Sequence, residues 1–186
     1  DSKGNPLPYL EAVTIQFIPD IQSEFMLFLQ GKLDFINSLD TSYKDELLEP
    51  TGILRDKYKN RINMLKGPYL NTEYIGIYLD SNNEAIKSKK IRKAINLGFD
   101  RKLMISFLRN NIGYASKNGF IPKGLPGTTK TDFKYDPIFA KRLVSDFISE
   151  TGKEPTMTIS TDANYVDLCE YLQRELEKIG IKIKIE

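Results

Sequence analysis

The chain has 186 residues, and its 27 lysine and arginine residues nearly balance its 25 aspartate and glutamate residues. This balance, together with the dispersed aromatic residues, argues against a nucleic-acid-binding protein, which needs a basic surface and stacking platforms. The absence of histidine removes the most common general base and metal ligand, and a single cysteine, Cys169, excludes an internal disulfide. We therefore expect a binding module that is not an enzyme and uses no metal or other cofactor.

The first part of the chain has the pattern of a strand, a helix and a second strand. Apolar and polar residues alternate over 13–17, which predicts a strand with one buried face. Ser23 is placed to cap a helix that ends at Gly31. A short strand is then expected over 33–36.

The middle of the chain is expected to contain short helices and two further strands. Two short helices are predicted, one that begins at Thr41-Ser42 and stops before Pro50, and a second that holds Ile53, Leu54 and Tyr58. The segments 61–65 and 73–79 are both strand-like. A glycine inside a strand often marks the close approach of a ligand or another backbone. The residues on one face of the second segment are Tyr74, Gly76 and Tyr78.

Two more helices and a long loop follow. The first helix is expected over 88–97, and Asp100 can cap the second. The segment 113–135 is rich in Gly, Pro, Thr and Lys, and a loop of this length is uncommon in a compact domain and often functional. Asp136 and Pro137 then begin a long helix, because proline is favoured at the first helical position.

The last part of the chain predicts a strand–helix–strand unit. A strand at 157–160 is followed by a helix that Asp162 or Asn164 can cap, and by a strand over 181–185. Cys169 lies on the apolar stripe of this helix, where a buried small hydrophobe is the expected role. Such a unit places its two strands parallel, so the predicted fold class is α/β.

Several segments, taken in order, form a recognisable set of motifs. The most specific is Ile91-Arg92-Lys93-Ala94-Ile95-Asn96-Leu97-Gly98-Phe99-Asp100-Arg101. The others include Leu29 to Asp34, Tyr135-Asp136-Pro137 and Lys178 to Ile183. The set resembles the family of bacterial extracellular solute-binding proteins that serve oligopeptide, dipeptide and nickel importers.

The resemblance implies a fold like one lobe of a type II periplasmic binding protein, with a mixed sheet flanked by helices. It implies that residues 1–38 are a strand–helix–strand piece of lobe I, and that 39–186 are most of lobe II, ending before the ligand-binding strand. The hinge is then expected near Ser38 to Ser42. With one lobe mostly missing, we expect the chain to bind peptides weakly or not at all.

The implied function is that of the substrate-binding component of an ABC importer. Such a protein captures peptides or similar small solutes outside the cytoplasmic membrane and delivers them to permease subunits. It is periplasmic, or a lipoprotein held on the outer face of the membrane, although no signal peptide is visible. Two alternatives remain open, namely a sensor or interaction domain with the same fold and a small α/β enzyme built from Asp, Lys and Tyr.

The resemblance also implies which residues bind ligand. Arg109 matches a basic position that can pair with a peptide carboxylate, although it also suits a solvated helix end. Asp162 and Asn164 match positions near side-chain pockets, although helix capping explains them as well. The ligand-binding candidates are Tyr74, Gly76, Tyr78, Arg109, Asp162 and Asn164. The motif residues expected to be structural are Arg92, Asp100 and Arg101.

Overall fold

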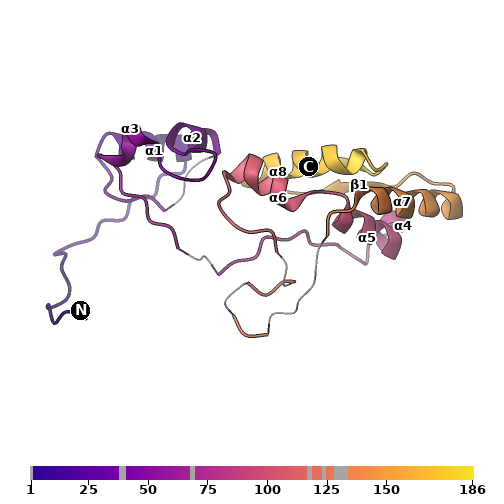
Figure 1. Ribbon diagram of the computed structural model, residues 1–186, viewed down its shortest axis with the longest axis horizontal. Coiled ribbons are helices and arrows are strands. Elements are labelled where there is room, and N and C mark those ends of the chain that lie inside the picture. The colour runs from indigo at the N-terminus through magenta and orange to yellow at the C-terminus, as the bar shows by residue number, and fades with distance from the viewer. Residues whose placement is uncertain (1, 38–40, 68–69, 117–118, 123–124, 128–133) are drawn as a thin grey trace. The chain divides into compact units, whose positions relative to one another are not determined.

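The computed structural model describes residues 2–37, 41–67, 70–116, 119–122, 125–127 and 134–186. The chain divides into two compact units, Asp1–Lys44 and Asp45–Glu186 (Figure 1). The boundary predicted between residues 38 and 39 lies outside the described residues. The assignment of the two parts to lobes I and II therefore stays a prediction.

The first unit is organised around helix α1, Ile21–Leu29. Asp20 is its N-cap, and the Ser23 backbone N–H donates to Asp20 Oδ1 at 2.7 Å. The prediction that Ser23 caps this helix is therefore wrong, because Ser23 already lies in the first turn and supplies the donor. Phe25 is buried and packs against Tyr43 of helix α2, Thr41–Leu47, with ring centroids 4.5 Å apart.

Four segments that were predicted to be strands are irregular in the structure, namely 13–17, 33–36, 61–65 and 73–79. A strand needs a neighbour that accepts and donates its ladder hydrogen bonds, and no described segment pairs with these four. The side chain of Phe17 is accordingly 93% exposed. The strand predictions are wrong for the described chain, because alternation specifies a face but does not supply a partner strand.

The second unit begins with a compact turn. Leu48 and Leu54 form an isolated antiparallel bridge, and helix α3 covers Asp56–Lys59. A helix holding Ile53, Leu54 and Tyr58 was predicted, but only Tyr58 lies in α3. The bridge to Leu48 holds Leu54 in extended pairing and keeps it out of the helix.

Three helices follow, and each begins at a side-chain cap. They are α4, Glu84–Lys87, α5, Lys89–Leu97, and α6, Arg101–Arg109. The caps are Asn83, Ser88 and Asp100, whose side chains accept backbone N–H groups of the first turn. The predicted helix over 88–97 and the predicted cap at Asp100 are confirmed.

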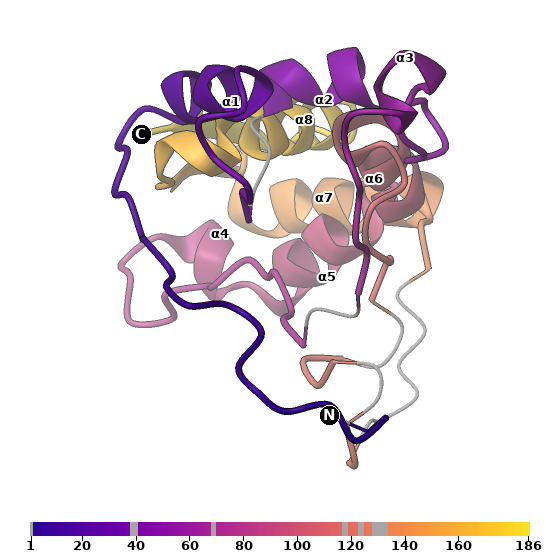
Figure 2. The same ribbon diagram turned by 90° about the vertical axis from the view of Figure 1, so that its left-hand side faces the viewer.

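The main core lies between α5 and the long helix α7, Pro137–Thr151, which lie side by side in Figures 1 and 2. Helix α7 begins as predicted, with Asp136 accepting the Phe139 backbone N–H. The segment between α6 and α7 contains no helix or strand where it is described, and 117–118, 123–124 and 128–133 lie outside the described residues. The buried core residues are Ala85, Ile91, Ala94, Ala140, Val144, Phe147, Leu176, Ile179 and Ile181.

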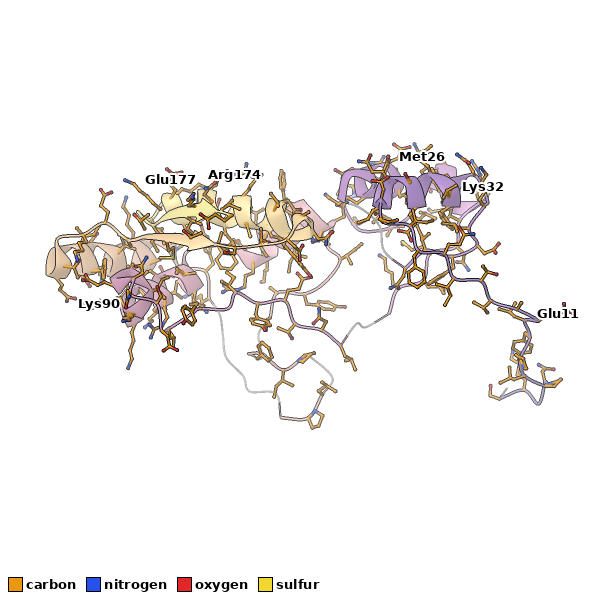
Figure 3. All side chains as sticks on the ribbon, turned by 180° about the vertical axis from the view of Figure 1, so that it is seen from behind. Glu11, Met26, Lys32, Lys90, Arg174 and Glu177 are labelled. Atoms are coloured by element: carbon orange, nitrogen blue, oxygen red, sulfur yellow. The ribbon has the colours of Figure 1, made fainter. Side chains whose placement is uncertain are left out.

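The C-terminal part is the predicted strand–helix–strand unit. Strand β1, Thr156–Ile159, and strand β2, Lys182–Ile185, pair in parallel, with Thr156 opposite Lys182. Between them lie a 3-10 helix η1, Ala163–Tyr165, and helix α8, Val166–Glu177. In Figure 3, Arg174 and Glu177 project from the outer side of α8, while its apolar side packs into the core.

The fold is therefore α/β, mostly helical with a small parallel sheet. The expected mixed sheet is not present among the described residues, whose sheet has two parallel strands. The other strands were expected from the four irregular segments. Apolar and polar residues alternate in these segments, but no described segment pairs with them.

Candidate functional site

Tyr165 marks the place where three segments of the second unit meet. It ends η1, just beyond the carboxyl end of β1. The Glu73 carboxylate is near enough to its phenol to raise the pKa, and Asp162 and Arg109 also lie within electrostatic reach of the phenol. Segment 73–79, the end of α6 and the loop after β1 are thus brought together, and we call Glu73, Arg109, Asp162, Tyr165 and Asp167 the Tyr165 cluster.

The charges in the cluster act on the Tyr165 phenol in opposite directions. The Glu73 carboxylate is the main cause that raises the pKa of Tyr165, with smaller contributions from burial and from Asp162. A negative charge nearby disfavours the phenolate, whereas the Arg109 guanidinium acts the other way. The phenol therefore stays protonated and able to donate a hydrogen bond.

Arg109 is held by Asp167 through both of its terminal nitrogens. Its Nη1 lies 2.6 Å from Asp167 Oδ2 and its Nη2 lies 3.2 Å from Asp167 Oδ1. The same Nη1 donates to the Leu108 carbonyl oxygen at 2.9 Å. The two-pronged geometry is the strong form of an arginine–carboxylate pair, and it ties the end of α6 to the beginning of α8.

Asp162 caps the short helix η1, so the prediction that Asp162 or Asn164 caps the helix that carries Cys169 is wrong. Its Oδ1 accepts the Asn164 backbone N–H at 2.8 Å, so it caps η1, while α8 itself begins without a side-chain cap. Capping leaves the second carboxylate oxygen available for other partners. The carboxylate lies in the loop just after β1, which is the edge where open α/β sheets bind ligands.

The candidates on segment 73–79 are exposed. The Tyr74 ring packs edge-on against Phe120 with centroids 4.6 Å apart, and the rest of its side chain faces solvent. Tyr78 is 72% exposed. A β-carbon added to Gly76 would meet only Tyr74 Cε2, at 3.9 Å, so no backbone approaches this glycine closely in the described chain.

The structure thus brings Arg109 and Asp162 together at Tyr165, with Tyr74 adjacent in sequence to Glu73. Glu73, Tyr165 and Asp167 were not singled out from the sequence. The signal pointing to Tyr165 and Asp167 is their position in the connection that follows the predicted strand 157–160, at the edge where polar side chains gather.

The three motif residues make structural contacts. Arg92 Nη1 donates to the carbonyl oxygens of Ile86 and Lys87 at the end of α4. Arg101 Nη1 donates to the Asn96 carbonyl oxygen, and its guanidinium lies 4.2 Å from the centre of the Phe99 ring. Burial lowers the pKa of Arg101. Asp100 is the N-cap of α6.

A shallow hollow elsewhere in the second unit is a weaker candidate. It has a volume of about 190 Å³ and lies where α4 and α7 approach β1. Ligand sites for drug-sized molecules run from about 300 to 1,000 Å³, so this hollow is too small for a peptide. Its charged rim is already paired, because Lys153 Nζ lies 2.8 Å from Glu84 Oε1.

Other kinds of site find no support in the described residues. They contain no group of three or more His, Cys, Asp or Glu side chains placed to hold a metal ion. Cys169 is a buried free thiol on α8. Within the described ranges, no helix combines the length and the apolar character that crossing a bilayer requires.

Comparison with known proteins extends over nearly the whole chain. The model of the family described as "Bacterial extracellular solute-binding proteins, family 5 Middle" matches residues 3–186. The chain is 27% identical, over 198 aligned positions, to the "Oligopeptide-binding protein AppA" of Bacillus subtilis (strain 168). That match covers 96% of this chain and 34% of the relative. The chain spans about a third of the length of the curated relatives it matches.

Solved structures of other binding proteins share the fold. The periplasmic binding protein DppA of Helicobacter pylori, in complex with the peptide STSA, has a TM-score of 0.75 and 19% identity, covering 98% of this chain and 34% of that one. NikA of Brucella suis, in complex with Fe(III)-EDTA, has a TM-score of 0.68 and 22% identity, covering 100% and 39%. At these identities the likeness is one of fold.

Proposed function

Since the chain belongs to family 5 of the bacterial extracellular solute-binding proteins, we propose that it is part of the substrate-binding component of an ABC importer. In this role it captures peptides or similar small solutes outside the cytoplasmic membrane. It binds its ligand without converting it chemically, and the bound ligand passes to ABC permease subunits. The protein acts in the periplasm or anchored to the outer face of the membrane.

The relatives support this class of ligand. One is named an oligopeptide-binding protein, and a structural neighbour holds the peptide STSA. Another neighbour holds Fe(III)-EDTA, which is a small chelate of carboxylates and amines. A peptide offers the same kinds of polar group, so the proposal covers peptides and small solutes of similar chemistry.

The observation that carries the proposal is the Tyr165 cluster at the carboxyl end of β1. It brings a neutral phenol within electrostatic reach of carboxylates and a guanidinium, which supports a shared polar surface. A peptide backbone needs such donors and acceptors, and the exposed ring of Tyr74 adds apolar contact area next to them. We propose that this surface is one wall of a ligand cleft, which in binding proteins of this kind closes by a hinge motion.

Each candidate residue has a role in the proposal. Tyr74 and Tyr78 supply ring faces, and Gly76 leaves room for the ligand main chain between them. Asp162, at the end of the loop after β1, and Asn164, in η1, face the ligand. Asp167 occupies the Nη1–Nη2 edge of Arg109, so a ligand carboxylate binds at that edge only by displacing Asp167.

The proposal is tested by identifying what the protein carries. The protein is purified from its own host under native conditions, and bound solutes are released with denaturant and identified by mass spectrometry. We expect peptides or small solutes to be recovered, and much less to be recovered from a Tyr165→Ala variant. Lys153→Ala, at the shallow hollow, is the matched control and should retain the ligand.

Two results would contradict the proposal. If the whole substrate-binding component, purified from its host, carries no small solute, and none binds to it when peptides are added, the function is wrong. If Tyr165→Ala and Lys153→Ala retain the same amount of ligand, the ligand binds at a surface other than the Tyr165 cluster.

A further inference from the structure

Two asparagine side chains at the end of α6 hold a turn that lies 61 to 65 residues earlier in the chain. Asn110 Nδ2 donates to Asp45 Oδ1 at 3.2 Å and to the Glu49 carbonyl oxygen at 3.4 Å. Asn111 Nδ2 donates to the Pro50 carbonyl oxygen at 2.9 Å. Asn110 is only 5% exposed, so the contact is shielded from water. We call these three hydrogen bonds the asparagine clamp.

The backbone on both sides of the clamp is shaped for this contact. Asn110 and Asn111 have positive φ angles of 45° and 59°, in the left-handed region that asparagine adopts more readily than most residues. Gly52 lies in the clamped turn, and a β-carbon added to it would stand 2.6 Å from the Asn110 carbonyl oxygen. The close fit of the turn against α6 thus depends on two asparagines and a glycine.

The clamped turn belongs to a segment, 45–61, that is held together by its own contacts. Leu48 and Leu54 form the antiparallel bridge, and the Tyr58 phenol donates to Glu46 Oε1 at 2.7 Å. Helix α2 runs from the first unit into this segment, because the boundary between the units falls after Lys44. A continuous helix therefore joins segment 45–61 to the first unit, while the clamp joins it to the second.

The clamp is the weaker of these two connections. Among the described residues, the apolar clusters around α5, α7 and α8 include none of the segment's buried leucines, which are Leu47, Leu48 and Leu54. Side-chain hydrogen bonds contribute little net stability, because water offers similar partners after release. Residues 62–67, which follow the segment, form neither helix nor strand, so no ladder of hydrogen bonds resists a change in their direction. Separating the segment from α6 therefore costs less than breaking α2.

We propose that the asparagine clamp is releasable. It holds segment 45–61 on α6 when the ligand cleft is closed, and it releases the segment, which then moves with the first unit as a folded body, when the cleft opens. The inference rests on the proposed function, because that function supplies the hinge motion. The main rival is a permanent clamp. A permanent clamp predicts only lower stability when the asparagines are replaced, whereas a releasable clamp predicts a second folded arrangement.

The test measures distances between pairs of spin labels by pulsed electron paramagnetic resonance, in the 186-residue chain without ligand and in a Cys169→Ala background. One pair joins Lys59→Cys on α3 to Lys141→Cys on α7, and it reports whether the segment is docked. A second pair joins Lys59→Cys to Gln22→Cys on α1, and it reports whether the segment stays with the first unit. All three labelled positions are exposed.

Three changes are compared in this labelled chain. Asn110→Ala together with Asn111→Ala removes the clamp. Gly52→Ala keeps the asparagines but adds a methyl group that meets the Asn110 carbonyl oxygen. Asn60→Ala, at an exposed asparagine of the same segment, is the control. The backbone amide NMR signals of Leu48 and Leu54 check that the segment stays folded.

We expect the first pair to show two distances, one for the docked and one for the released segment. The ratio of released to docked molecules should rise about tenfold or more in the double asparagine variant, because two to three hydrogen bonds are lost. Gly52→Ala should shift the ratio in the same direction, and Asn60→Ala should leave it unchanged. The second pair should keep one distance throughout.

Three results would overturn the inference. The first is a single docked distance in every folded variant, or a ratio that the substitutions leave unchanged. The second is a released distance that appears only when the Leu48 and Leu54 signals are lost, because the segment has then unfolded. The third is a second pair whose distance changes on release. If the double asparagine variant does not fold, Gly52→Ala decides. The measurement uses no ligand, so a protein that carries no solute contradicts the proposed function and leaves this result standing.

Discussion

The backbone of Gly98 lies so close to Ile179 that a β-carbon added to the glycine would stand 2.6 Å from Ile179 Cδ1. The same atom would lie 2.8 Å from the Ala94 carbonyl oxygen and 2.9 Å from Leu176 Cδ2. Gly98 directly follows α5, and the two apolar side chains come from the end of α8 and the turn after it. The small residue in the 91–101 motif is thus explained by the close packing of two helices.

We predict that Gly98→Ala lowers the free energy of unfolding by about 1–3 kcal/mol, because the added methyl overpacks the core and the Ala94 carbonyl cannot rotate away. Glycine-to-alanine changes at unstrained sites stabilise by about 0.4–1 kcal/mol through the unfolded state, so a net loss identifies the clash. Urea unfolding measures the difference. Gly76→Ala, where the nearest atom is 3.9 Å away, is the control, and equal stability of the two variants would contradict the prediction.

Helices were predictable from the sequence because their signals are local. Asp100 and Asp136 each precede an apolar stripe by one turn, and both cap the expected helix. Strands 13–17 and 73–79 were predicted from alternation that is equally clear, yet they have no partner among the described residues. The parallel pair β1 and β2 was predictable because a helix of suitable length joins the two strands.

The candidate site was only partly predictable for a similar reason. Arg109 and Asp162 were selected by resemblance to a family, and the structure places both within reach of Tyr165. Arg109 and its partner Asp167 are 58 residues apart in the sequence. No local sequence pattern specifies which carboxylate pairs with a given arginine. Glu73 likewise depends on how an irregular segment passes the loop after β1.

A second prediction concerns stability at high pH. Burial, with smaller contributions from the Glu175 and Asp100 carboxylates, raises the pKa of Tyr171 from 10.0 to about 12. The unfolded chain releases this proton first, so the contribution to stability is complete below pH 10 and is lost as the pH rises to about 12. We expect the free energy of unfolding to fall over this range by up to about 2 kcal/mol more in the unaltered chain than in Tyr171→Phe. Urea titrations at a series of pH values measure the two slopes, and parallel slopes would contradict the assignment.

A third prediction tests the geometry of the Tyr165 cluster. Since the Glu73 carboxylate is the main cause that raises the pKa of Tyr165, Glu73→Gln should lower that pKa toward its ordinary value. The change is followed by NMR of ring-labelled tyrosine, with the signal assigned from a Tyr165→Phe variant. Glu84→Gln removes an equal charge on α4, where Glu84 pairs with Lys153, and should leave the Tyr165 titration unchanged. An equal response to both substitutions would mean that net charge, and not the Glu73 contact, governs the phenol.

The last prediction measures what the Arg109–Asp167 pair contributes to stability. A double-mutant cycle with Arg109→Ala and Asp167→Ala removes each partner alone and both together, so the coupling energy isolates their interaction. We expect about 1 kcal/mol, at the upper end for ion pairs near a surface, because the geometry is two-pronged and both side chains are mostly shielded. The matched cycle on Lys182 and Glu154, whose side chains are 62% and 65% exposed, should give a coupling near zero.

Added salt should remove any coupling energy of the exposed Lys182–Glu154 pair. Much of the Arg109–Asp167 coupling energy should survive, because partly buried pairs are screened less. Equal couplings in the two cycles would show that Asp167 binds Arg109 no more strongly than Glu154 binds Lys182 at the surface. The Arg109 guanidinium would then be available to a ligand.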